Sequence, residues 1–131
     1  MAEHVLVIDD DQNIVQIMQL ALQSGGYTSE AAYNARDGMA KACSNPPALI
    51  LLDYNMPGKD GLTLLKDIHS IPELAEVPII LVTALSIPDI VSQAVTQGAT
   101  GFLVKPFDLS TLLKHVKEAL KPKEDSESSA E

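Results

Sequence analysis

The sequence is short of several features, and each shortage excludes a class of protein. Cys43 is the single cysteine among 131 residues, which rules out an internal disulfide framework and suits a reducing compartment. We expect Cys43 to be a small buried side chain. No apolar run approaches a membrane span in length, and no basic segment leads into a long apolar stretch at the N-terminus. The sequence therefore predicts a soluble, cytoplasmic protein with no membrane insertion.

Positive charge is also scarce. Nine Lys and Arg residues stand against 18 Asp and Glu residues, so the formal net charge is -9. Such a chain is not expected to bind nucleic acid directly or to lie on an anionic membrane. The histidines, His4, His69 and His115, are scattered without metal-ligand spacing, and we interpret them as surface or packing residues. Neither a Ser–His–Asp arrangement nor a Gly-rich phosphate loop after the first strand is present.

Short strand-like and helix-like segments alternate along the chain. The strand-like runs are apolar and β-branched, whereas the helix-like runs carry apolar residues three and four positions apart. Such alternation predicts an α/β fold with a parallel sheet covered on both faces. The expected strands are 4–8, 28–32, 48–52, 78–82 and 100–104, and the expected helices are 12–24, 35–43, 62–69, 87–97 and 109–120.

Capping residues support these helix boundaries. Asn34, Ser86 and Asp108 stand where N-caps are expected, and glycines at 25–26 and 98 stand where helices should end. We assign residues 1–121 to one domain. Residues 122–131 are mostly acids and serines that cannot bury apolar surface, so a disordered acidic tail is predicted there.

Polar residues follow four of the five expected strands. Asp9 and Asp10 follow the first, Asp53 the third, Thr83 the fourth and Lys105 the fifth. Open α/β sheets bind ligands beyond the carboxyl ends of their strands. If those strands are neighbours, these side chains converge on one pocket.

The acidic members of this set suit a divalent cation. Mg²⁺ prefers oxygen ligands in an octahedral arrangement and usually keeps several waters. Asp10 and Asp53 could supply carboxylates, the backbone carbonyl of Asn55 a third ligand, and Asp9 a contact through water. A cation would offset the mutual repulsion of these carboxylates.

The remaining members suit phosphoryl transfer. Lys105 can pair with a phosphoryl oxygen and Thr83 can donate from its hydroxyl, so Asp53 would be the nucleophile that forms an acyl phosphate. Taken singly, each residue also has an ordinary structural explanation. The acids at 9–11 could favour a helix N-terminus, Asp53 could be a turn residue, Thr83 a strand end and Lys105 a surface lysine. Their joint occurrence at the ends of the appropriate strands favours the functional interpretation.

These residues lie in motifs that resemble the response-regulator receiver domains of two-component signalling, over about residues 3–121. The resemblance implies a flavodoxin-like (βα)5 doubly wound sheet with strand order 2-1-3-4-5. The motifs are Val-Ile-Asp-Asp-Asp at 7–11, Leu-Leu-Asp-Tyr-Asn-Met-Pro-Gly-Lys-Asp-Gly at 51–61, Val-Thr-Ala at 82–84 and Lys-Pro-Phe at 105–107.

The resemblance also implies roles for individual residues. Asp53 would accept a phosphoryl group from a histidine kinase or a phosphotransfer protein, with Mg²⁺ held by Asp10, Asp53 and the Asn55 carbonyl. Asp9 would complete the acidic pair, and the bond between residues 105 and 106 would be cis. Such a domain is a phosphoacceptor that assists its own phosphorylation and dephosphorylation and is otherwise no enzyme. Residues two after the acceptor and two after the threonine, Asn55 and Leu85, would modulate hydrolysis of the acyl phosphate.

A switch is implied as well. Thr83 would move toward the phosphoryl group and Phe102 would turn inward, changing the face of the fourth and fifth helices that binds an output protein. The alternative for Phe102 is permanent burial. Residues 99–101, Ala-Thr-Gly, lack the acidic pair of the winged-helix DNA-binding subfamily, so the chain resembles a stand-alone, chemotaxis-type receiver.

Two other functions remain open from the residues. An aspartyl-phosphate phosphatase also uses an Asp nucleophile and Mg²⁺, but it would place Asp-x-Asp after its first strand. A phosphate-independent interaction module would not need the intact acidic, hydroxyl and lysine set. Incubation with a small phosphodonor and Mg²⁺ separates these functions.

Overall fold

The computed structural model describes residues 3–56, 58–84 and 88–120. Within them, five parallel strands form one sheet in the order β2-β1-β3-β4-β5. The strands are β1 (His4–Ile8), β2 (Thr28–Ala32), β3 (Leu49–Asp53), β4 (Ile79–Thr83) and β5 (Gly101–Val104). The helices are α1 (Gln12–Ser24), α2 (Ala35–Ser44), α3 (Gly61–His69), α4 (Pro88–Thr96) and α5 (Leu109–Ala119). The predicted α/β class, the flavodoxin-like fold and the strand order are confirmed.

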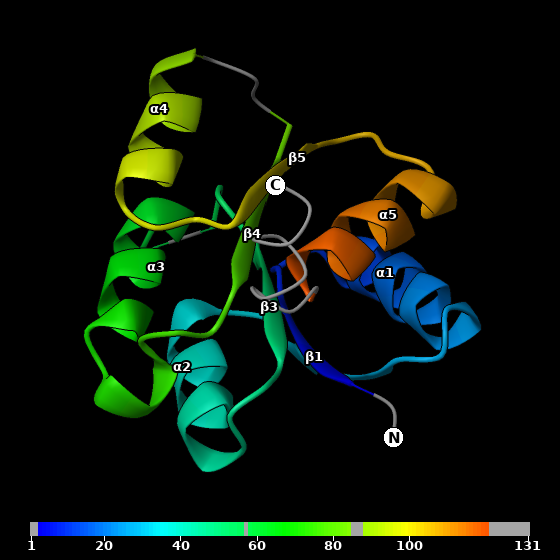
Figure 1. Cartoon of the computed structure of the whole chain (residues 1–131), viewed down its shortest axis with the longest axis horizontal. Coiled ribbons are helices and arrows are strands. Elements are labelled where there is room, and N and C mark those ends of the chain that lie inside the picture. Colours follow the sequence, from blue (N-terminus) through cyan, green and yellow to red (C-terminus); the bar gives the residue numbers. More distant parts are fainter. Residues whose placement is uncertain (1–2, 57, 85–87, 121–131) are drawn as a thin grey trace, which may run out of the picture.

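The helices form a layer on each face of the sheet (Figure 1). Helices α2, α3 and α4 lie on one side, and α1 and α5 lie on the other. Right-handed crossovers explain this division, because the chain moves one way from β1 to β2 and the opposite way from β2 through β5. The reversal leaves a switch point between β1 and β3, where doubly wound sheets bind their ligands.

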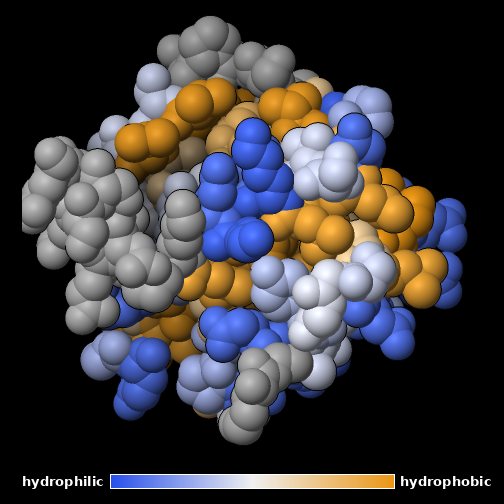
Figure 2. Space-filling model, turned by 45° about the vertical axis from the view of Figure 1, so that its right-hand side comes forward, coloured by the Kyte–Doolittle hydropathy of each residue, from blue (hydrophilic) through white to orange (hydrophobic). Residues whose placement is uncertain are grey.

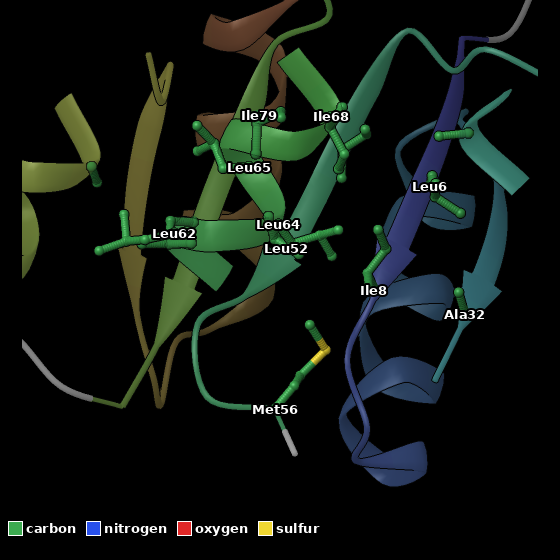
Figure 3. Close-up of a cluster of buried hydrophobic side chains, with 14 of the residues drawn as sticks. Leu6, Ile8, Ala32, Leu52, Met56, Leu62, Leu64, Leu65, Ile68 and Ile79 are labelled. Atoms are coloured by element: carbon green, nitrogen blue, oxygen red, sulfur yellow. The ribbon is translucent and has the colours of Figure 1, made fainter. Parts of the chain in front are cut away.

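Successive side chains of each strand point to opposite faces of the sheet, so a separate hydrophobic core forms on each face. Leu6, Ile50 and Leu52 face the cluster beneath α2 and α3, whereas Val7 and Leu51 face the cluster beneath α1 and α5. Figure 3 shows the first cluster, with Leu52, Leu64 and Ile68 among its members. Strands that are buried on both faces need apolar residues at successive positions, which accounts for the continuous apolar runs in the sequence.

Local capping sets the helix boundaries. Asp11, Asn34, Asp60 and Asp108 accept hydrogen bonds from backbone N–H groups in the first turns of α1, α2, α3 and α5. Gly98, which follows α4, has φ of 99°, a conformation that L side chains rarely adopt. Asn34 and Asp108 are thus confirmed as caps.

Several sequence predictions need correction in detail. Cys43, predicted to be buried, is exposed, because the buried face of α2 carries Gly38 and Ala42 and the next residue turns toward solvent. Asp53 and Thr83 are the last residues of β3 and β4 and do not follow them. A short 3-10 helix, Pro72–Leu74, was not predicted and buries Leu74.

Some predictions lie outside the described residues. These are the cap at Ser86, the role of Leu85 in hydrolysis and the acidic tail at 122–131. None of the helices in the described part of the chain has the length and apolar character needed to span a bilayer.

Candidate functional site

The polar residues singled out in the sequence meet at the carboxyl edge of the sheet. Their strands, β1, β3, β4 and β5, are successive neighbours in the sheet. Backbone hydrogen bonds continue past the strand ends, from the Tyr54 N–H to the Val82 carbonyl at 2.9 Å and from the Lys105 N–H to the Thr83 carbonyl at 2.7 Å. These bonds fix the backbone beside each functional side chain.

Three carboxylates gather at this edge. Asp9 is fully buried and Asp53 is 3 % exposed, whereas Asp10 is exposed to solvent. One oxygen from each lies within 4.8 Å of the others. One oxygen of Asp9 is held by the backbone N–H of Asp11 at 2.9 Å. The site is therefore an acidic pocket with two buried carboxylates and one at its mouth.

Lys105 joins the two buried carboxylates. Its Nζ donates to Asp9 Oδ2 at 3.0 Å and to Asp53 Oδ1 at 3.2 Å. The lysine side chain is only 19 % exposed, so both ion pairs are largely shielded from water. A buried carboxylate without a charged partner would be strongly disfavoured, and Lys105 provides that partner.

The pocket changes the proton affinity of Asp53. Burial, followed by the negative charge of Asp9, raises the pKa of Asp53 from 3.8 to about 6. The Lys105 ammonium and a backbone hydrogen bond from Asn55 oppose that rise. Asp53 is consequently still mostly ionised at pH 7.

Lys105 is shifted in the complementary direction. Burial alone would lower the pKa of Lys105, but the hydrogen bond to Asp9 and the charges of both aspartates outweigh it and raise the pKa above its usual value. Lys105 therefore remains a cation at neutral pH, and the site keeps one fixed positive charge beside Asp53.

The donor set fits Mg²⁺. When ionised, three carboxylates and one ammonium leave a charge of about -2, which a divalent cation neutralises. One carboxylate oxygen from each of the three aspartates lies within 4.8 Å of the others, so these oxygens are close enough together to face one cation. Asp10, Asp53 and the Asn55 carbonyl are the residues that would hold the ion.

Thr83 and Phe102 lie near the site on neighbouring strands. Thr83 is fully buried at the end of β4. Phe102 lies opposite Leu81 in β5 and packs, half-buried, against the core beneath α3 and α4. Phe102 is thus partly buried in this structure. The bond between Lys105 and Pro106 is cis, as the resemblance implied.

Two residues beside the site were assigned no role from the sequence. Met56 is buried in the core although it lies in the loop after Asp53, and Gly61 begins α3 in contact with the Asp53 backbone. Both stand in the quoted 51–61 motif, which was the only signal available for them.

Comparisons with known proteins identify the family of the chain. A sequence profile of the family described as "Response regulator receiver domain" matches residues 5–117. The chain belongs to that family. Receiver domains act in two-component signalling, where they interact with histidine kinases and output partners, and they generally bind Mg²⁺ at an acidic pocket.

Individual relatives place the chain among response regulators. It is 34% identical over 119 residues to the uncharacterized transcriptional regulatory protein YkoG of Bacillus subtilis, covering 90% of this chain and 51% of that protein. It is 37% identical over 116 residues to the transcriptional regulator NtrC of Salmonella typhimurium, covering 88% and 24%. The chain thus spans about half or less of these curated relatives.

Solved structures cover the chain more evenly. The Vibrio cholerae chemotaxis protein CheY4 superposes with a TM-score of 0.88 and 34% identity, covering 92% of this chain and 100% of that one. A CheY-like receiver from Methanospirillum hungatei has a TM-score of 0.88 and 28% identity, covering 96% and 99%. These receiver structures therefore match more than nine tenths of this chain and nearly the whole of their own length.

Proposed function

We propose that this receiver domain is a phosphorylation-dependent switch whose phosphoacceptor is Asp53. The observation that carries the proposal is the pair of hydrogen bonds from Lys105 to Asp9 and Asp53 inside a buried acidic pocket. A buried ion-pair network confined to structure would not need a third carboxylate, Asp10, open to solvent at its mouth. Perturbed titration together with convergent charged groups is typical of functional sites.

The chemical step is a transfer from a phosphohistidine of the donor to Asp53. A carboxylate oxygen of Asp53 attacks phosphorus, a P–O bond forms, and the P–N bond to the donor imidazole breaks. The leaving imidazole takes up a proton, and Asp53 becomes an acyl phosphate. Lys105, already within hydrogen-bond distance of Asp53, is placed to pair with an oxygen of the incoming group.

Mg²⁺ held by Asp10, Asp53 and the Asn55 carbonyl would supply charge neutralisation for the pocket and for the transferred group. The residues themselves perform the remaining work. Asp9 is anchored by the Asp11 N–H and by Lys105, so it keeps its position while Asp53 reacts.

The donor must reach Asp53 from the open side of the pocket. A groove beside the site is lined almost entirely by apolar atoms of Ile14, Ile17, Ala84, Lys105, Pro106 and Phe107. Ile17 and Leu20 on α1 are 47% and 66% exposed. Figure 2 shows apolar surface on the side of the molecule that carries α1 and α5. We assign this surface to the histidine kinase or phosphotransfer protein.

The output would be read on the face formed by α4, β5 and α5. Phosphorylation would draw Thr83 toward the phosphoryl group, and Phe102 would fill the space that Thr83 leaves. Residues 90–104 contain no charged side chain, although the chain carries a net charge of -9. Val95 is 65% exposed and Val104 is 38% exposed. An output protein would therefore bind α4 and β5 mainly through apolar and uncharged polar contacts, whereas α5 adds the charged side chains of Lys114, Lys117 and Glu118.

Intact-mass measurement after incubation with acetyl phosphate and Mg²⁺ tests the proposal. Wild type should gain one phosphoryl group and Asp53→Asn should gain almost none. Asp67→Asn, a half-buried carboxylate on α3, is the matched control and should label like wild type. Equal labelling of Asp53→Asn and wild type would refute the assignment, and turnover of many phosphomonoesters per protein would indicate a phosphatase.

A further inference from the structure

The loop between β3 and α3 carries Asn55, whose peptide group lies against the phosphoacceptor. A backbone hydrogen bond connects Asn55 to the Asp53 carboxylate. Asn55 itself is exposed, so its own side chain does not anchor the loop in the core. The position of its peptide therefore depends on its neighbours in the chain.

Gly61 anchors the loop at its end. Its N–H donates to the Tyr54 carbonyl at 2.7 Å. A Cβ at Gly61 would lie 2.6 Å from the Asp53 carbonyl oxygen and 2.7 Å from the Tyr54 Cα. Both contacts are with backbone atoms, which cannot move aside without displacing the loop. The absence of a side chain at Gly61 thus allows the first turn of α3 to press against the peptide that follows the phosphoacceptor.

Met56 anchors the loop from the other side of Asn55. Its side chain is only 6% exposed and belongs to the core cluster that contains Ile8, Leu52 and Leu64. In Figure 3 the Met56 side chain extends from the loop toward Leu52 and Ile8. Asn55 therefore lies between Tyr54, which is bonded on both its N–H and its carbonyl, and a buried methionine.

We propose that Met56 and Gly61 are positioning residues for the metal site, because their contacts hold the Asn55 peptide beside Asp53. The inference rests on the proposed function, in which the Asn55 carbonyl is a ligand. A loop that is already ordered loses little conformational freedom on binding, so the affinity for Mg²⁺ is higher than for a loose loop. Residues that orient metal ligands commonly change affinity by about 10- to 100-fold when replaced.

The test is a Mg²⁺ titration of each purified variant, followed by amide NMR shifts under conditions where circular dichroism shows all proteins folded. Met56→Ala and Gly61→Ala should weaken Mg²⁺ binding by about tenfold or more. Met56→Leu, which keeps the apolar volume, should stay within about twofold of wild type. Met56→Val serves as a milder truncation if the alanine variant does not fold.

Met18→Ala is the matched control. Met18 is equally buried, at 1% exposure, but lies in the other core cluster beneath α1 and α5. Its replacement should reduce stability and leave Mg²⁺ affinity within about twofold of wild type. Wild-type affinity in Met56→Ala and Gly61→Ala, or an equal loss in Met18→Ala, would overturn the inference. Failure of wild type itself to bind Mg²⁺ would overturn the proposed metal site, and this inference with it.

Discussion

Asp53→Asn is expected to make the folded protein more stable at pH 7 in metal-free buffer, although it removes the proposed phosphoacceptor. Burial and the charge of Asp9 raise the pKa of Asp53 from 3.8 to about 6. Each pKa unit corresponds to about 1.4 kcal/mol. Keeping Asp53 ionised in the folded state therefore costs up to about 3 kcal/mol, and a neutral amide avoids much of that cost.

The pH dependence of this gain has a definite sign. Because the folded-state pKa lies above 3.8, the folded protein holds a proton between about pH 4 and 6 that the unfolded chain has released. The contribution of Asp53 to the free energy of unfolding of the wild type therefore decreases as pH rises through that window. The advantage of Asp53→Asn should be full above about pH 6 and should disappear below about pH 4.

Urea unfolding followed by circular dichroism at pH 7 and pH 4 measures the difference in the free energy of unfolding between Asp53→Asn and wild type at each pH. Mg²⁺ should reduce the stability difference between Asp53→Asn and wild type at pH 7. The ion stabilises the folded wild type by mass action, and Asp53→Asn lacks one of the carboxylates proposed to bind the ion. Asp67→Asn is the control, because Asp67 is 41% exposed in its pair with Lys59 and its loss should change stability by less than about 1 kcal/mol. A lower stability of Asp53→Asn than wild type at pH 7, or an equal difference at both pH values, would refute the reasoning.

Three further predictions concern the metal, the lysine and the donor surface. Asp10→Ala removes the exposed carboxylate of the pocket and should weaken Mg²⁺ binding at least about tenfold by calorimetric titration; unchanged affinity would place the ion elsewhere. Lys105→Ala should still accept phosphate from acetyl phosphate, but should show smaller NMR shift changes over α4 and α5 on phosphorylation; wild-type shifts there would contradict its coupling role. Ile17→Glu should slow phosphorylation by a protein donor about tenfold and leave labelling by acetyl phosphate unchanged, whereas Val95→Glu on the opposite layer should leave both rates unchanged; equal effects of the two variants would remove the donor surface from α1.

Much of the fold and of the candidate site was predictable because the evidence for it is local. Apolar runs of about five residues, helical spacing and capping residues such as Asn34 and Asp108 mark each element within a short stretch of chain. Alternation of those elements then restricts the topology through crossover handedness. The same segmentation placed Asp9, Asp53 and Lys105 at strand ends.

What only the tertiary structure decided depends on contacts between distant parts of the chain. The bonds from Lys105 reach residues 96 and 52 positions away. Burial and the charge of Asp9, opposed by Lys105, set the pKa of Asp53. The contact of Gly61 with the backbone that follows β3 depends on how closely α3 packs there, and no rule of sequence spacing predicts that distance. Cys43 was placed wrongly for a related reason, because burial of a helix position depends on which face meets the sheet. The sequence by itself thus determined the elements and the order of the polar residues, whereas packing of the helices on the sheet decided which groups touch, since contact energies fall off within a few ångströms.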